Sequence, residues 1–331
     1  MVIYWLVSTG YLMEAEGVNS MRRVIAIKAR KGTWKRDFQM NKGLYLLSIP
    51  IIAFFVIFNY LPMGGLLMAF EDYKPQRGLM GSQWVGLANF ITFFSSPNFL
   101  QILRNTLVIS LLNLFIAFPL SIVFALLLNE VHLIKFKKVV QTISYMPYFI
   151  SIVVITGLIR EFCATHGVVT NLAVALLGIP RENLLTNPNY FWIINLLSDI
   201  WQGLGYSSII FVAALTSISS ELHEAAALDG ANRFQRVIHV NIPAIMPTIV
   251  TMLILRCGSL LSVGFEKILL LYNPSIYSNA DVISSHVQRM GIEKAQYGYS
   301  TAVGLFNSVV GTILLFLSNA ISRKYADTSV F

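Results

Sequence analysis

The residues of this chain that are best suited to bind a ligand stand inside long apolar segments. Arg256 occurs in the apolar stretch 243–263, and Asp199 occurs in the stretch 190–216. Ionisable groups are costly in such surroundings, so they are retained for pairing or for function. A guanidinium group that faces a ligand attracts carboxylates. For Arg256 two alternatives stay open: it pairs with an acid of a neighbouring helix or extends its charge to a polar boundary, or it faces a ligand.

A second group of polar and aromatic residues follows one stretch of the chain at helical spacing. Aromatic rings stack on the apolar faces of sugars, while amides and carboxylates bind hydroxyl groups. The group in the stretch 190–216 consists of Asn195, Asp199, Trp201, Gln202 and Tyr206, and weaker candidates of the same kind are Asn113 and Asn307. Hydrogen bonding between helices explains the same pattern equally well, so both interpretations remain open.

Catalytic and metal-binding motifs are not found in the sequence. No Gly-x4-Gly-Lys-Ser/Thr phosphate loop occurs, and no hydrolase nucleophile motif is visible. Cys163 and Cys257 stand far apart, and no ligand spacing relates the histidines, which are His132, His166, His223, His239 and His286. We therefore expect no catalytic site, no metal site and no cofactor in this chain.

Composition places the chain among polytopic helical membrane proteins. Hydrophobic residues make up 56% of the 331 positions, charged residues only 12%, and the mean hydropathy is +0.66. Several apolar stretches reach the roughly 20 residues that cross a bilayer as a helix. An all-α protein with six transmembrane helices is predicted, with spans near 43–70, 105–128, 139–159, 190–216, 243–263 and 300–321.

The placement of lysine and arginine predicts the orientation. The net charge is +8, and basic residues gather on the cytoplasmic side of membrane proteins. The N-terminal tail 1–42, the loop after the second span, the loop 219–243 and the C-terminal end carry most of them. Both termini are therefore expected in the cytoplasm. Residues 1–20 lack the basic start and cleavage site of a signal peptide, so we assign them to the cytoplasmic tail.

The loop 219–243 has the signals of a helix, a tight turn and a second helix. Ser219 or Ser220 is suited to cap the first helix, and Asp229-Gly230 is a turn signal that ends it. A second helix is expected over about 232–240, and Pro243 is expected to begin the fifth span. By physical arguments alone, this segment is an amphipathic hairpin on the cytoplasmic face.

The same loop resembles the signature of permease subunits of binding-protein-dependent ABC importers. That signature is Glu-Ala-Ala, three residues, Gly, nine residues, an aliphatic, one residue, an aliphatic and Pro. It falls here on Glu224, Ala225, Ala226, Gly230, Val240, Ile242 and Pro243, with Val240 and Ile242 where the family usually has Ile and Leu. The resemblance implies that the loop is a coupling helix seated on a separate ATPase. It assigns this role to Glu224, Ala225, Ala226, Asp229 and Gly230.

The resemblance extends over most of the chain beyond about residue 42. The segment 70–94, the Arg104-Asn-Thr-Leu opening of the second span, and the stretches 264–274 and 299–307 are similar to carbohydrate permeases of the maltose-permease-like group. Within it the chain resembles permeases of alginate importers, which take up an acidic polysaccharide. The fold implied for 43–331 is the transmembrane domain of a type I ABC importer.

The function implied is import of an oligosaccharide, acidic in the case of alginate, across the bacterial inner membrane by alternating access. The implied partners are a second, non-identical permease, two ATPase subunits that bind ATP and Mg²⁺, and a periplasmic binding protein that meets the outward loops. An alternative is a secondary transporter driven by an ion gradient, which favours internal repeats and a relay of carboxylates. No clear repeat is visible, and Asp199 has no acidic neighbour in its stretch. An intramembrane enzyme is disfavoured because no catalytic set converges.

Overall fold

The computed structural model describes residue 38 and residues 40–325, so the predicted tail up to residue 37 lies outside the described residues. The chain divides into two units, one up to Gly64 and the other from Gly65 onward. Four described helical runs are long and apolar enough to cross a membrane, namely Lys42–Phe70, Phe99–Glu130, Arg233–Gly258 and Tyr297–Lys324. Two bent helix pairs bring the number to six if each pair crosses once.

The first unit contains α3 (Lys42–Phe55) and the π-helical turn Val56–Tyr60, and the 3-10 segment Leu61–Phe70 continues the run into the second unit. Pro62 lacks an N–H, and its ring presses on the carbonyl group four residues earlier, inside the π turn. A local π or 3-10 adjustment is a known way for a membrane helix to accept a proline.

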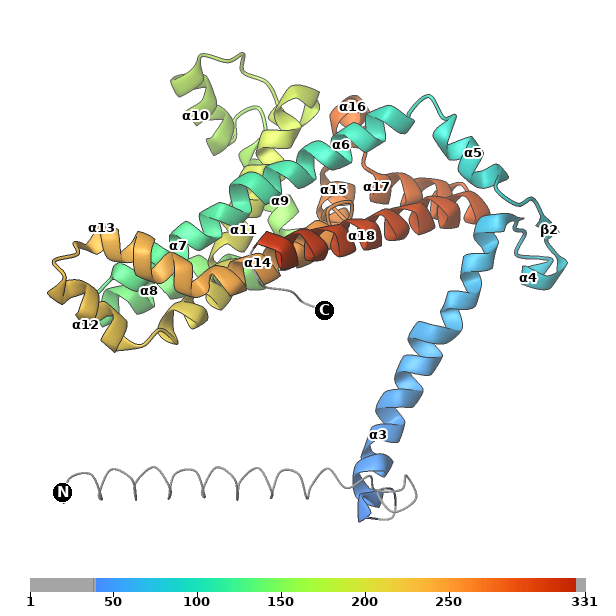
Figure 1. The fold of residues 1–331 in the computed structure, drawn as a ribbon. Coiled ribbons are helices and arrows are strands. Elements are labelled where there is room, and N and C mark those ends of the chain that lie inside the picture. Colours follow the sequence, from blue (N-terminus) through green and yellow to red (C-terminus); the bar gives the residue numbers. More distant parts are fainter. Residues whose placement is uncertain (1–37, 39, 326–331) are drawn as a thin grey trace. The chain divides into compact units, whose positions relative to one another are not determined.

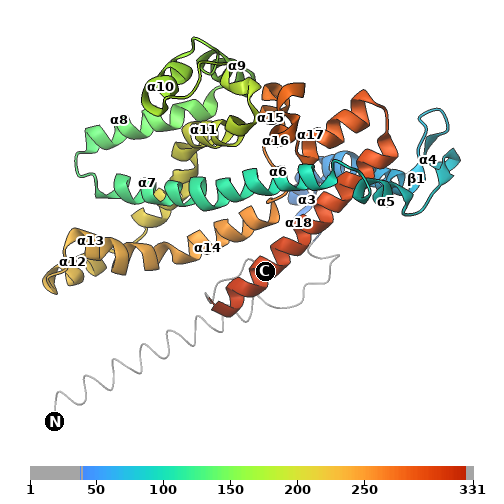
Figure 2. The same ribbon diagram turned by 90° about the horizontal axis from the view of Figure 1, so that it is seen from above.

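The same arrangement recurs twice in the second unit. The π turn Asn113–Ala117 joins α6 (Phe99–Leu112) to α7 (Phe118–Glu130) and is followed by Pro119. The π turn Val237–Asn241 joins α13 (Arg233–Arg236) to α14 (Ile242–Gly258) and is followed by Pro243. In each case the proline stands two residues after the π turn. The prolines therefore widen these helices without ending them, and Figure 2 shows α6 and α7 as one continuous rod.

The α-helix α14 begins at Ile242 with Pro243 in its first turn, as predicted. The π turn Val237–Asn241 joins it to α13 without a break, so the helical run starts earlier than the predicted span, at Arg233. The helix also ends at Gly258, earlier than the predicted limit near 263.

The predicted third span, 139–159, is divided between two helices. The helices α8 (Ile134–Tyr145) and α9 (Ile152–Phe162), with the 3-10 turn Met146–Phe149 between them, bend by 99°. The backbone leaves the helix at Ile150 and Ser151, and the Ser151 hydroxyl caps α9 by accepting a bond from the Val154 N–H at 3.4 Å. A proline in the turn and a serine cap explain the break locally.

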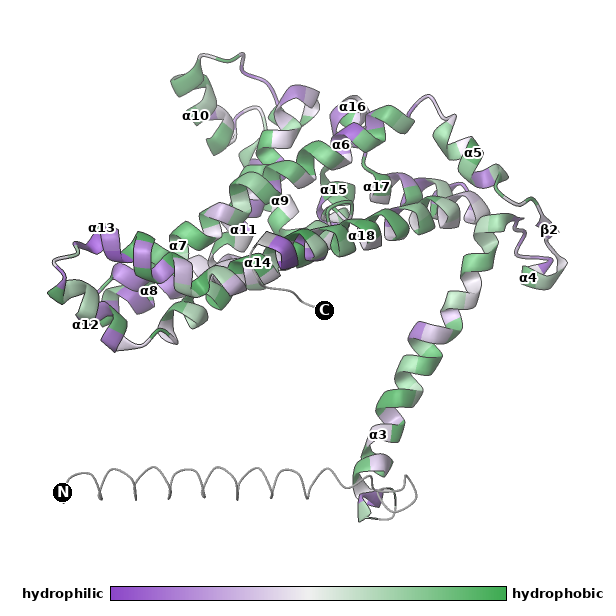
Figure 3. Cartoon of the chain, in the orientation of Figure 1, coloured by the Kyte–Doolittle hydropathy of each residue, from purple (hydrophilic) through white to green (hydrophobic). Residues whose placement is uncertain are grey.

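The central helix of the second unit is α11 (Pro188–Thr216), which packs against α7, α8 and α14. It bends by 71° into α12 (Ser220–Leu228). The last long helix is α18 (Tyr297–Tyr325), which packs along α14 (Figure 1). Hydrophobic residues predominate on α6, α7, α14 and most of α18, while hydrophilic residues gather on α8 and α13 and at the C-terminal end of α18 (Figure 3).

Short elements fill the connections of this unit. The strands β1 (Glu71–Asp72) and β2 (Gln83–Trp84) pair in antiparallel register, with Glu71 opposite Trp84. The short helices are α4 (Gly78–Gly81), α5 (Ala88–Phe94), α10 (Val168–Leu177), α15 (Phe265–Leu271), α16 (Tyr277–Ala280) and α17 (Ile283–Gln288). The connections also contain two 3-10 turns, Leu184–Thr186 and Pro274–Ile276, and the π turn Arg289–Glu293.

Candidate functional site

A cavity of about 270 Å³ opens between the π turn Asn113–Ala117, α11 and the C-terminal end of α14. Three of the predicted ligand-binding residues line it: Asn113, Asp199 and Arg256. Its other lining residues are Ser110, Leu114, Ala117, Ile200, Gly203, Leu204, Ser207, Ser259, Leu260, Ser262, Val263 and Gly264. The wall therefore combines one acid, one base, an amide and several hydroxyl groups. We call this space the Arg256 cavity.

Asp199 is held by three side chains. Its Oδ2 atom accepts hydrogen bonds from the Asn113 amide at 3.1 Å and from the Asn195 amide at 3.0 Å. Its Oδ1 atom forms an ion pair with Lys267 of α15. The sequence analysis grouped Asn113, Asn195 and Asp199 as polar candidates, and the structure brings them together. Lys267 was not among the candidates of the sequence analysis, although the apolar residues Ile268–Leu271 that follow it are a signal of burial.

Arg256 lies in the last turn of α14. Its Nη2 atom is 3.4 Å from the Ser207 hydroxyl oxygen, and its guanidinium carbon is 5.6 Å from the centre of the Phe118 ring. No carboxylate of the described residues lies within 4.0 Å of the guanidinium. Of the two alternatives for Arg256, pairing with a neighbouring acid is therefore not seen in the described part of the chain.

A second hollow, of about 480 Å³, shares Ser207 and Arg256 with the Arg256 cavity. It is lined by Phe118, Tyr206, Ser207, Ile209, Ile210, Phe211, Met252 and Arg256. The Tyr206 ring stacks on Tyr148 at a centroid distance of 3.7 Å and an interplanar angle of 2°, and both rings are about half exposed. Tyr148 was not predicted, because it comes from the turn between α8 and α9. Its signal was the aromatic pair Tyr148-Phe149 after a proline.

The remaining predicted residues of the pathway do not line either space. Gln202 and Trp201 lie on α11, with Trp201 46% exposed. Asn307 lies on α18, and its buried Oδ1 atom has no hydrogen-bond partner among the described residues. The polar stripe expected on α11 is thus divided. Asp199 faces the Arg256 cavity with Asn195 bound to it, and Tyr206 faces the second hollow.

The loop 219–243 forms the helix, turn and helix that its sequence predicts, and both helices are capped. The Ser219 hydroxyl accepts a bond from the Glu221 N–H at 3.2 Å. Asn232 and Gln235 form a reciprocal capping box on α13. Gly230 connects the helices with a φ of +80°, which a residue with a Cβ rarely adopts.

The predicted coupling residues are mostly on the surface of this hairpin. Glu224, Ala225, Asp229 and Gly230 are exposed, and Ala226 is half-buried. A hollow of about 390 Å³ separates the two helices, lined by Ala226, Asp229, Gly230, Ala231, Gln235, Arg236, His239 and Val240. Apolar groups project beside the acids, with Leu228 89% and Phe234 72% exposed. A surface of this kind suits a partner with apolar and basic groups, and the role of these residues stays a prediction.

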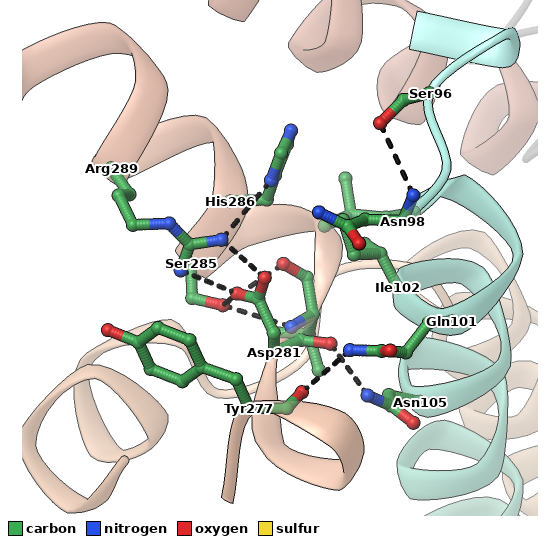
Figure 4. A network of polar contacts seen from close by, with 12 residues as sticks. Ser96, Asn98, Gln101, Ile102, Asn105, Tyr277, Asp281, Ser285, His286 and Arg289 are labelled. Atoms are coloured by element: carbon green, nitrogen blue, oxygen red, sulfur yellow. Dashed lines mark hydrogen bonds and ion pairs between the residues drawn. The ribbon is translucent and has the colours of Figure 1, made fainter. Parts of the chain in front are cut away.

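The segment before α18 is fastened to α6 by a network of polar contacts (Figure 4). Asp281 and Arg289 form an ion pair whose second contact measures 3.0 Å, and Ser285 donates to Asp281 at 2.8 Å. Asn105 donates to the carbonyl oxygen of Asp281 at 3.0 Å, and Gln101 donates to that of Tyr277 at 3.0 Å. The carboxylate of Asp281 raises the pKa of Arg289 above its ordinary value. The network therefore joins the segment 277–289 to α6.

His286 lies in the same segment and is buried. Its Nε2 atom is 2.9 Å from the Tyr299 hydroxyl oxygen. Burial lowers the pKa of His286 below its ordinary value, with Arg289 and Lys294 acting in the same direction and Asp281 opposing them. The imidazole is therefore held in its neutral form.

Comparison with known proteins identifies the family. The model of the family described as "Binding-protein-dependent transport system inner membrane component" matches residues 117–327. Protein LplB of Bacillus subtilis (strain 168) is 42% identical over 318 residues, which are 96% of this chain and 100% of that protein. The polygalacturonan/rhamnogalacturonan transport system permease protein YteP of the same organism is 41% identical, covering 88% of this chain and 91% of that protein.

Two solved structures are also similar. A chain of a bacterial alginate ABC transporter, solved with an alginate pentasaccharide-bound periplasmic protein, has a TM-score of 0.82 at 41% identity and covers 90% of this chain and 99% of that chain. A bacterial ABC transporter involved in the import of the acidic polysaccharide alginate has a TM-score of 0.81 at 42% identity, covering 88% and 98%.

These matches confirm the predicted fold class and the predicted family, and they do not favour the ion-driven alternative. The chain belongs to the family of binding-protein-dependent transport system inner membrane components, the permease subunits of ABC importers.

Proposed function

We propose that this chain is one of two non-identical permease subunits of an importer that moves acidic oligosaccharides into the cytoplasm. A periplasmic binding protein delivers the sugar to the outward loops. Two partner ATPase subunits bind ATP and Mg²⁺, and their closure reverses the access of the pathway. Both termini of the permease face the cytoplasm, with residues 43–331 as the transmembrane domain. The hairpin with Glu224, Ala225, Ala226, Asp229 and Gly230 docks onto one ATPase.

The main observation in favour of an acidic substrate is the environment of Arg256. Its guanidinium lines two adjoining spaces and has no carboxylate partner among the described residues. Arg256 is exposed in this chain, but it stands in a helical run that is long and apolar enough to cross a membrane, where an ionisable side chain is normally paired or functional. A carboxylate on the sugar supplies the missing partner by a charge-assisted bond.

The surroundings of Arg256 also suit a sugar ring. The stacked pair Tyr206 and Tyr148 offers an aromatic face for the apolar side of a pyranose. The Ser207 hydroxyl and the Asn113 amide offer hydrogen bonds to its hydroxyl groups. The names of the similar proteins support the same class, since alginate is an acidic polysaccharide and polygalacturonan is a polymer of a uronic acid.

Replacement of Arg256 by Gln tests this proposal. The complete importer is reconstituted with its binding protein, and uptake is compared for an acidic oligosaccharide and its carboxyl-reduced form. A lost charge-assisted bond of roughly 1.5–3 kcal/mol predicts a fall of about tenfold or more for the acidic sugar, with little change for the reduced one. Arg323→Gln, at the exposed end of α18, is the matched control. Equal losses for both sugars in Arg256→Gln would exclude the carboxylate role.

A further inference from the structure

Lys267 is a buried cation that stands directly behind the wall of the Arg256 cavity. It is 4% exposed and does not line the cavity itself. Its ammonium group is satisfied by three acceptors: the Asp199 carboxylate, the Ser198 hydroxyl at 2.8 Å and the Asn195 carbonyl oxygen at 3.2 Å. An ammonium has three N–H donors, so this one has no hydrogen left for a ligand.

Asp199 differs from Lys267 because its side chain reaches the cavity. It is 31% exposed and lines the wall together with Arg256. Asp199 and Arg256 are the charged residues of that wall, and without Lys267 their formal charges cancel. A carboxylate that enters such a cavity is attracted by Arg256 and repelled by Asp199 to a similar degree.

The ion pair changes this balance. Because Lys267 neutralises Asp199 from the buried side, the wall and the residue behind it carry one net positive charge, that of Arg256. We propose that Lys267 is the residue that sets the charge selectivity of the cavity, by cancelling Asp199 and leaving Arg256 free to bind a carboxylate. This inference rests on the proposed function, because it names the residue that makes the same site select acidic sugars.

A purely mechanical role is the rival explanation for the pair. Lys267 joins α15 to α11, so its loss would also loosen the packing of α15. Removing one partner of a buried ion pair is strongly destabilising, whereas removing both partners costs much less. A mechanical role predicts equal losses for acidic and neutral sugars, because a loosened helix does not distinguish their charges.

The experiment measures the ratio of acidic to carboxyl-reduced sugar uptake in the reconstituted importer. The same binding protein is used throughout, so its own preference cancels when a variant is divided by the wild type. Lys267→Met exposes an uncompensated Asp199 to the cavity and is expected to lower the ratio about tenfold. The double variant Lys267→Met/Asp199→Asn removes both charges and is expected to restore the wild-type ratio. Lys74→Met, which removes the lysine of an exposed ion pair with Asp72, is the matched control.

The single variant Asp199→Asn covers the case in which Lys267→Met does not assemble. It removes the negative charge of the wall, so its ratio is expected to equal or exceed that of the wild type. A lower ratio in Asp199→Asn, an unchanged ratio in an assembled Lys267→Met, or a double variant that stays as low as Lys267→Met would overturn the inference. A wild type that imports neither sugar would contradict the proposed function instead, so the two failures are distinct.

Discussion

Gly205 of α11 lies against the backbone of Ser144 in α8. A Cβ atom added at Gly205 would stand 2.2 Å from the Ser144 carbonyl oxygen and 2.8 Å from the Tyr145 ring. These are distances at which backbone must move, because no flexible side-chain end is available to yield. The close approach of the two helices therefore depends on a residue without a side chain at this position.

The variant Gly205→Ala is expected to lower the stability of the protein by about 1–3 kcal/mol, the usual cost of forcing an extra methyl group into a packed contact. Thermal unfolding in detergent, followed by tryptophan fluorescence, measures the effect. The matched control is Gly203→Ala, two residues earlier on the same helix, where an added Cβ meets nothing within 4 Å. An equal loss of stability in both variants would indicate a general effect of alanine on α11 and not a contact with Ser144.

The exposed carboxylate of Glu224 is expected to bind a basic group of the partner ATPase. Glu224→Gln should therefore reduce the amount of ATPase recovered with the permease on co-purification, by about tenfold for a charge-assisted bond. The control is Glu221→Gln, which removes an exposed acid from the first turn of the same helix. If both variants retain the ATPase as well as the wild type, the predicted docking role of Glu224 is wrong.

The buried imidazole of His286 predicts a dependence of stability on pH. Burial lowers its pKa in the folded protein below the ordinary value of 6.5, so the unfolded chain binds a proton more readily than the folded one. Its contribution to stability is complete above about pH 6.5 and is lost as the pH falls toward the lowered value. The midpoint temperature of thermal unfolding should therefore decrease as the pH is lowered from about 7.5 to about 5.5.

The variant His286→Gln separates this effect from the titration of other groups. Glutamine keeps a polar partner for the Tyr299 hydroxyl but has no proton to gain, so the pH dependence should weaken. A variant whose midpoint falls with pH as steeply as that of the wild type would show that His286 is not the responsible group.

Much of the architecture could be predicted because its signals are local. The apolar stretches mark the long helices, and Ser219, Asp229-Gly230 and Asn232 mark the ends of α12 and α13. Such signals act through hydrogen bonds between residues a few positions apart, so the sequence displays them directly. The same holds for the polar residues Asn195 and Asp199, four positions apart on one helix.

The prolines show where local interpretation reaches its limit. Pro243 was expected to begin a helix because proline suits the first turn, and it does stand in the first turn of α14. The sequence did not show that the π turn Val237–Asn241 joins α14 to α13, as similar π turns precede Pro62 and Pro119. At Pro147 the chain does bend, where the Ser151 cap starts a new helix. The sequence shows the proline, while packing of the flanking helices decides between a widened helix and a bend.

By itself, the sequence determined the class of the protein, the apolar helices, the capped hairpin and the presence of Arg256 and Asp199 in apolar stretches. Only the tertiary structure decided which side chains form pairs. Lys267 lies 68 positions from Asp199. Tyr148 lies in the turn between α8 and α9, whereas Tyr206, on which it stacks, lies on α11. Contacts between distant segments depend on how helices pack and not on spacing along the chain, so no pattern in the sequence selected these partners. That packing pairs Asp199 with Lys267 and places Asp199 and Arg256 in the wall of one cavity.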